Sequence, residues 1–166
     1  MRYGLVGLLL SLWCLLRRVG RQGKAPTAKS PKSLRERAER GDAVAQFLLG
    51  ARYDLGQGMA QDVAEAAHWY RKAAVQGYAP AQVALGLMYA LGGGIAQDYV
   101  EAHLWINLAA SHASGSRQKR YTDLREAFAG VMTPAQIAEA QRRAGEWKPT
   151  TGGHPEPINS RQLRVA

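Results

Sequence analysis

The chain contains an internal repeat of 36 residues. Residues 41–76 (GDAVAQFLLGARYDLGQGMAQDVAEAAHWYRKAAVQ) and 77–112 (GYAPAQVALGLMYALGGGIAQDYVEAHLWINLAASH) align without a gap, and 18 of the 36 positions are identical. Gln, Asp, Tyr and Trp stay in step, which a shared bias toward Ala, Gly and Leu would not produce. Tandem units of this length each form one supersecondary structure, and stacking buries a common core between them. The structure of one unit therefore constrains the whole fold.

The first half of each unit has the periodicity of a helix. Shared residues at intervals of three and four predict helices over 43–54 and 79–90. In the first unit these residues are Gln46, Leu49, Gly50 and Tyr53. Glycine-rich sequences follow at 55–58 (LGQG) and 91–94 (LGGG). Because glycine adopts the left-handed conformation of a helix C-cap, both helices are expected to end there.

A second helix in each unit is predicted to begin at Asp62 and Asp98. Aspartate is a preferred N-cap, and the acidic residue three positions later complements the helix dipole. Two antiparallel helices pack closely where small residues meet large ones. The repeated small residues are Gly50, Gly86, Ala73 and Ala109, and the large ones are Tyr53, Tyr89, Trp69 and Trp105. One hairpin cannot bury both its faces, so the two units are expected to stack into a right-handed array.

The shared pattern is A-Q-x-x-L-G-x-x-Y-x-x-G-x-G-x-x-x-D-x-x-x-A-x-x-W, and it resembles the Sel-one-like repeat over residues 41–112. This repeat is a relative of the tetratricopeptide repeat with a longer loop. The resemblance implies an all-α fold: an α/α superhelix (solenoid) of two helix-hairpin repeats with N- and C-terminal capping helices. Known members are adaptors that assemble other proteins, which implies a non-catalytic scaffold for a protein or peptide partner. A cysteine-rich branch is linked to β-lactam binding, but this chain lacks those cysteines.

Sequences on either side of the repeats extend the predicted domain to 34–147. Ser33-Leu-Arg-Glu36 resembles the second helix of a preceding unit. Residues 113–147 lack the Gln, Gly and Asp landmarks and are interpreted as a C-terminal cap, with a helix over 117–130. Thr133 as N-cap, Pro134 at the first helical position and Gln136 then predict a capping box.

The chain ends are expected to lie outside the repeat domain. Residues 1–21 form a leader whose apolar run, 3–16, is too short to span a bilayer comfortably and is followed by Arg17-Arg18. It suggests a secretory signal or a short membrane tether, an organellar transit peptide, or an incidental leader. Export would place the domain outside the cytoplasm (periplasmic or secreted), whereas an uncleaved anchor would keep it on the cytoplasmic face. Residues 22–33 are interpreted as a flexible linker and 148–166 as a disordered tail.

The net charge of +9 belongs to the chain ends. Residues 1–33 carry +7 and 148–166 carry +2, whereas 34–147 hold 12 basic and 12 acidic residues. The predicted domain is therefore neutral, which argues against nucleic acid as a partner. Cys14, the single cysteine, lies in the leader, so the domain has no internal disulfide.

No pattern of residues predicts an active site, a metal site or a cofactor. The histidines (His68, His103, His112 and His154) have no metal-ligand spacing, and the pairs Asp62/Glu65 and Asp98/Glu101 are explained as helix starts. The chain is therefore predicted not to be an enzyme. Two alternatives remain open: a small secreted or periplasmic hydrolase acting on cell wall or β-lactams, and a unit that works by stacking end to end on a larger array.

A partner-binding groove is predicted on the first helix of each unit, where the repeats differ. Helical spacing places Val44, Phe47, Ala51 and Asp54 on one stripe, and Pro80, Val83, Leu87 and Ala90 on its counterpart. Such a groove would suit an apolar helix or an extended peptide. Since apolar residues at this spacing are more often core, burial of the stripe is the competing expectation.

Overall fold

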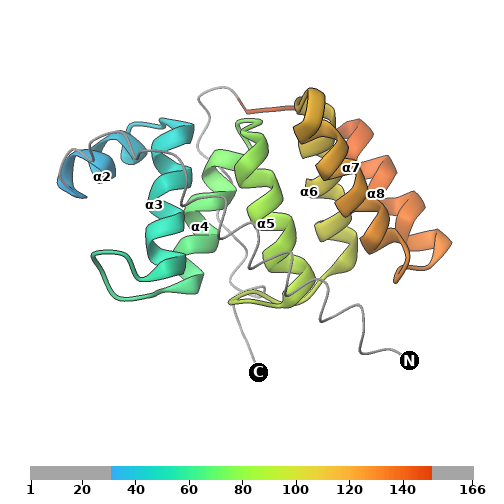
Figure 1. Cartoon of the computed structure of the whole chain (residues 1–166), viewed down its shortest axis with the longest axis horizontal. Helices are drawn as coiled ribbons and strands as arrows, with labels where there is room; N and C mark the ends of the chain where they lie inside the picture. Colours follow the sequence, from blue (N-terminus) through green and yellow to red (C-terminus); the bar gives the residue numbers. More distant parts are fainter. Residues whose placement is uncertain (1–30, 151–166) are drawn as a thin grey trace.

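A computed structural model describes residues 31–150, and all regular structure in this range is α-helical. The helices follow one another in chain order along the long axis of the molecule (Figure 1). They are α2 (Pro31–Glu39), α3 (Ala43–Leu55), α4 (Val63–Ala74), α5 (Ala79–Leu91), α6 (Tyr99–His112), α7 (Gly115–Ala129) and α8 (Pro134–Glu146). The predicted all-α solenoid of two helix hairpins is confirmed.

The two repeats form the hairpins α3–α4 and α5–α6, and α4 packs on α5 to join them. Helix α2 packs on α3 at the N-terminal end. At the other end α7 and α8 both pack on α6, much more closely than on each other. The C-terminal cap is therefore not a third hairpin of the same kind, because its two helices separate to cover α6.

The predicted helix ends are confirmed, with one difference in the role of the glutamates. The Asp62 and Asp98 carboxylates accept the N–H groups of Glu65 and Glu101 at 3.0 and 3.1 Å. The glutamate side chains do not return to the cap. In each repeat the carboxylate accepts the indole N–H of the tryptophan four residues later, Trp69 or Trp105, at 3.1 Å. Each glutamate carboxylate therefore holds a buried tryptophan in place and also favours the start of the helix. The capping box predicted at Thr133 is also present.

Each hairpin closes over a glycine in its first helix. A Cβ on Gly50 would lie 2.8 Å from the Tyr70 ring, and one on Gly86 would lie 2.7 Å from Cγ1 of Ile106. The large partners of these glycines are therefore Tyr70 and Ile106 and not the tryptophans. Glycine is required here because the second helix approaches too closely for any side chain.

The Gly86→Ala variant should be less stable than the parent by about 1–3 kcal/mol, as expected for an overpacked core. The new methyl group would also lie 3.0 Å from the backbone oxygen of Ala102, so repacking Ile106 alone cannot accommodate it. Gly93→Ala is the control, since nothing lies within 4 Å of its Cβ position. Urea denaturation of both variants checks this. Equal stability of the two would contradict the close packing of α5 on α6.

A buried glutamine joins each repeat to the preceding helix. The Gln46 side-chain amide donates to the backbone oxygen of Ala38 at 3.0 Å, and that of Gln82 donates to Ala74 at 3.1 Å. The amide oxygens meet the end of the second helix in their own hairpins: Gln46 accepts from Gln76 at 2.7 Å, and Gln82 contacts His112 at 3.3 Å. One glutamine therefore connects three helices, which explains why both repeats contain it.

A second type of contact between neighbouring units joins two residues 18 positions apart, and it occurs three times. Arg35 donates to the Tyr53 hydroxyl at 3.3 Å, and Arg71 donates to the Tyr89 hydroxyl. In the third copy the arginine lies on the later helix and not on the earlier one: Arg125 of α7 donates to Asn107 of α6 at 3.0 Å. Because the position in the contact is the same, α7 occupies the place of a first helix in a third unit.

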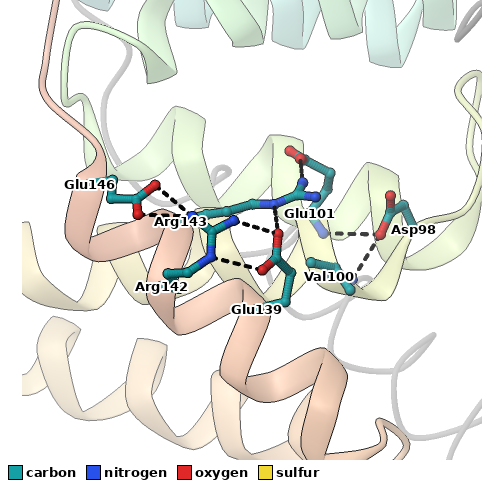
Figure 2. A network of polar contacts seen from close by, with 7 residues as sticks. All are labelled: Asp98, Val100, Glu101, Glu139, Arg142, Arg143 and Glu146. Atoms are coloured by element: carbon teal, nitrogen blue, oxygen red, sulfur yellow. Dashed lines mark hydrogen bonds and ion pairs between the residues drawn. The ribbon is translucent and has the colours of Figure 1, made fainter.

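Helix α8 is held to α6 by a network of ion pairs (Figure 2). Arg143 bridges Glu139 of its own helix, at 2.7 Å, and Glu101 of α6, at 3.0 Å. Arg142 pairs with Glu139 and Glu146, both at 2.8 Å. Hydrogen bonds from Arg142 and Arg143 lower the pKa of Glu139 to about 2. Glu139 therefore stays ionised well below neutral pH and keeps the Arg143 guanidinium, which reaches Glu101, in place.

Several predictions concern residues outside 31–150. These are the leader at 1–21, most of the linker at 22–33 and most of the tail at 148–166. Helix α2 already begins at Pro31, and the Thr150 N–H donates to the backbone oxygen of Val75 at 2.9 Å. Among the helices of the described range, none has the length and apolar content needed to cross a membrane.

Candidate partner-binding surface

Exposed aliphatic side chains gather on one face of α3. Within the described residues, four large hydrophobic side chains are exposed: Val44 (44%), Leu48 (40%), Leu55 (41%) and Val131 (42%). The first three lie on α3 at intervals of four and seven residues, so they share one face of the helix. Ala51 lies between them. We call Val44, Leu48, Ala51 and Leu55 the α3 stripe.

The α3 stripe lies opposite the residues that hold the repeat together. Leu49 is 2% exposed and Gln46 is 4% exposed, and both point toward the neighbouring helices. Packing therefore does not explain why Val44, Leu48 and Leu55 are aliphatic. A contiguous exposed apolar patch on a soluble domain is a typical feature of an interaction site.

The equivalent positions of the second repeat continue this face, but they are less open. The counterparts of the α3 stripe, 36 residues later, are Pro80, Ala84, Leu87 and Leu91. Leu87 is buried, at 4% exposed, and the other three are partly buried. The aliphatic character is thus common to both repeats, whereas exposure of large side chains is confined to α3.

The structure separates the residues of the sequence-predicted groove. Val44 is exposed, and Ala51 is partly buried beside it. Phe47 fills the space between the repeats, with its ring 5.6 Å from Tyr70 and 5.5 Å from Tyr78. Four others are buried: Asp54 (9%), Val83 (5%), Leu87 (4%) and Ala90 (3%), and Pro80 is partly buried. As a correction, Asp54, Val83, Leu87 and Ala90 cannot line an open groove, because their side chains have almost no accessible surface.

A small hollow opens where α7 begins, and sequence reasoning did not find it. Its volume is about 100 Å³, and it is lined by Ala79, Pro80, His112, Ala113, Ser114, Arg117 and Tyr121. Arg117 stands where the two repeats have Ala45 and Ala81, both fully buried. An arginine cannot occupy such a position, so the first half of α7 has no buried residue. This is why the units do not close against each other at this end.

The His, Asp and Glu side chains of the described range do not gather into a cluster. No group of three or more His, Cys, Asp or Glu side chains lies close enough to hold a metal ion in the range 31–150. The buried histidine, His103, has its pKa lowered by desolvation and by the charge of Arg125. His68 is partly buried, and burial also lowers its pKa.

Comparison with known proteins decides the family. The model of the Sel1 repeat matches residues 43–78 and again residues 79–114, which are the two hairpins. The chain contains two Sel1 repeats. The boundaries follow the structure, since the first match begins with α3 and the second with α5. No curated protein shows significant similarity.

Two solved structures with Sel1-type repeats resemble the chain. One is c5321, a protective antigen present in uropathogenic Escherichia coli strains that displays an SLR fold. It is 34% identical with a TM-score of 0.64, and the match covers 69% of this chain and 24% of that protein. The other is a Sel1 repeat protein from Oxalobacter formigenes. It is 32% identical with a TM-score of 0.52, and the match covers 68% of this chain and 47% of that protein. The chain thus spans a quarter to a half of these relatives.

Proposed function

We propose that this Sel1-repeat protein is a non-catalytic scaffold that binds a protein or peptide partner on the α3 stripe. Sel1 repeats generally mediate protein–protein interaction, and Sel1-repeat scaffolds are generally non-catalytic. The observation that carries the proposal is the exposure of Val44, Leu48 and Leu55 on one face of a helix whose other faces are packed. Covering this face would remove aliphatic surface from water at no loss of internal packing.

The geometry favours an elongated partner with aliphatic or aromatic side chains at regular intervals. The α3 stripe runs along three turns of the helix, from Val44 to Leu55, and an apolar helix face or an extended segment can follow it. Arg52, partly buried and four residues after Leu48, flanks the stripe. Apolar contacts would therefore provide the affinity, with a basic group at the edge.

The Leu48→Arg variant should weaken binding of any peptide that uses the α3 stripe by at least about tenfold, the equivalent of about 1.4 kcal/mol. A charge at the centre of the apolar surface must be desolvated on binding. Leu48 is 40% exposed, so the substitution should leave folding intact. The measurement is the Kd of peptides selected on the full-length chain from a random dodecapeptide library.

Ala138→Arg is the matched control, because Ala138 is exposed on α8 and lies outside the stripe. It should not change the Kd. Unchanged binding by Leu48→Arg, with melting temperatures of both variants near that of the parent, would show that the partner binds elsewhere.

A further inference from the structure

The beginning of α7 carries three exposed basic residues, two of which have no ion pair within residues 31–150. Arg117, Lys119 and Arg120 all lie within its first six residues. Lys119 pairs with Asp123 at 3.0 Å. Arg117 and Arg120 form no ion pair or hydrogen bond with any residue in the described range. Of these two, only Arg117 lines the hollow.

The hollow beside Arg117 offers hydrogen-bond donors and no acidic group. The polar members of its wall are His112, Ser114, Arg117 and Tyr121. The Ser114 side chain makes no cap hydrogen bond, so the first amides of α7 also lack a side-chain acceptor. The His112 Nδ1 contacts Gln82, whose amide oxygen is an acceptor. A guanidinium with neighbouring hydroxyl and amide donors is suited to a carboxylate.

One residue relates the hollow to the proposed binding face by its place in the repeat. Pro80 lines it and is also the counterpart, one repeat later, of Val44 in the α3 stripe. A partner segment that follows the α3 stripe to its Val44 end would turn there and cross the array past Pro80 to reach Arg117. The volume, about 100 Å³, is large enough for one short acidic side chain.

We infer that the partner segment is acidic, and that an Asp or Glu side chain enters the hollow and pairs with Arg117. This inference rests on the proposed function, because the α3 stripe supplies the apolar part of the same surface. The exposed guanidinium of Arg117, which has no ion pair among the described residues, lies beside a hollow lined by donors, and this arrangement is complementary to a carboxylate. A partner with a basic residue at this point would be excluded by repulsion from Arg117.

The test uses amidated synthetic peptides from the library selection and the full-length chain. Selected sequences should be enriched in Asp or Glu at one end. Replacing that residue by Gln should weaken binding to the parent protein about tenfold, and Arg117→Glu should weaken binding of the acidic peptide by at least as much. The Gln peptide should bind parent and Arg117→Glu with similar Kd values, because its contact with Arg117 is already lost.

Arg120→Glu is the matched control, since it makes the same change of charge on the same helix outside the hollow. Equal losses for Arg117→Glu and Arg120→Glu would overturn the inference in favour of a general charge effect, and so would equal binding of acidic and Gln peptides. If Gln peptides with a free C-terminus bind in an Arg117-dependent way, the hollow holds a chain end and not a side chain. The Leu48→Arg variant distinguishes failure of this inference from failure of the proposed function. Peptides whose Kd does not change with Leu48→Arg would contradict the proposed function itself.

Discussion

The Leu87→Arg variant is expected to lose about 3 kcal/mol or more of folding free energy. Leu87 is 4% exposed and belongs to the main core cluster, so a guanidinium at this position would be buried without a partner. Denaturation followed by circular dichroism measures the loss. This variant distinguishes a core position from a groove position, because a groove residue would tolerate the charge.

Ala51→Arg is the matched control, since Ala51 occupies the same position one repeat earlier and is partly exposed on α3. Its stability should stay within about 1 kcal/mol of the parent. A Leu87→Arg protein with the parental stability would contradict the burial of this residue and would restore it to the binding surface.

The Phe128→Ala variant should lose about 3–5 kcal/mol, the usual range for a buried phenylalanine. Phe128 of α7 is fully buried and is the largest such side chain in the described range. Its loss would leave a cavity in the core cluster that α7 shares with the second repeat. Val131→Ala, just after α7, changes a side chain that is 42% exposed and should shift stability by less than about 0.5 kcal/mol.

Chemical denaturation of the two variants checks this prediction. A small effect of Phe128→Ala would mean that α7 is an accessory to the array. A large effect would show that α7 belongs to the array, where it takes the place of the first helix of a third unit, as the Arg125–Asn107 contact indicates.

The fold could be predicted from the sequence because the repeat supplies its own alignment. Residues kept in both copies have matching structural tasks: Gln46 and Gln82 join helices, Gly50 and Gly86 allow close approach, and Asp62 and Asp98 cap. A single copy would show only amphipathic periodicity, whereas two copies show which positions are constrained by packing.

The binding face was harder to predict because helical spacing alone does not show which side of the helix is exposed. The predicted stripe ran through Phe47 and Asp54, one position away from Leu48 and Leu55. The repeated residues could have corrected it: Gln46, Leu49, Gly50 and Tyr53 mark the packed side of α3, and the side opposite their mean direction is the α3 stripe. Phe47 lies between the two sides, where it packs on Tyr78.

The hollow and the separation of α7 from α8 had weaker sequence signals. Both follow from substitutions in a segment where the repeat pattern fades. Arg117 in place of Ala45 and Ala81 indicates lost burial, but only once α7 is aligned as a first helix. That alignment depends on the Arg125–Asn107 contact, which has the arginine on the first helix and, as its partner, an asparagine in place of a tyrosine, and so leaves no repeated motif.

Methyl NMR during titration with a selected peptide tests the central claim most directly. The four exposed aliphatic residues of the described range provide both the probes and the control. The account predicts that the methyl signals of Val44, Leu48 and Leu55 shift on binding while those of Val131 do not. Shifts at Val131 with no change at the three α3 residues would contradict it.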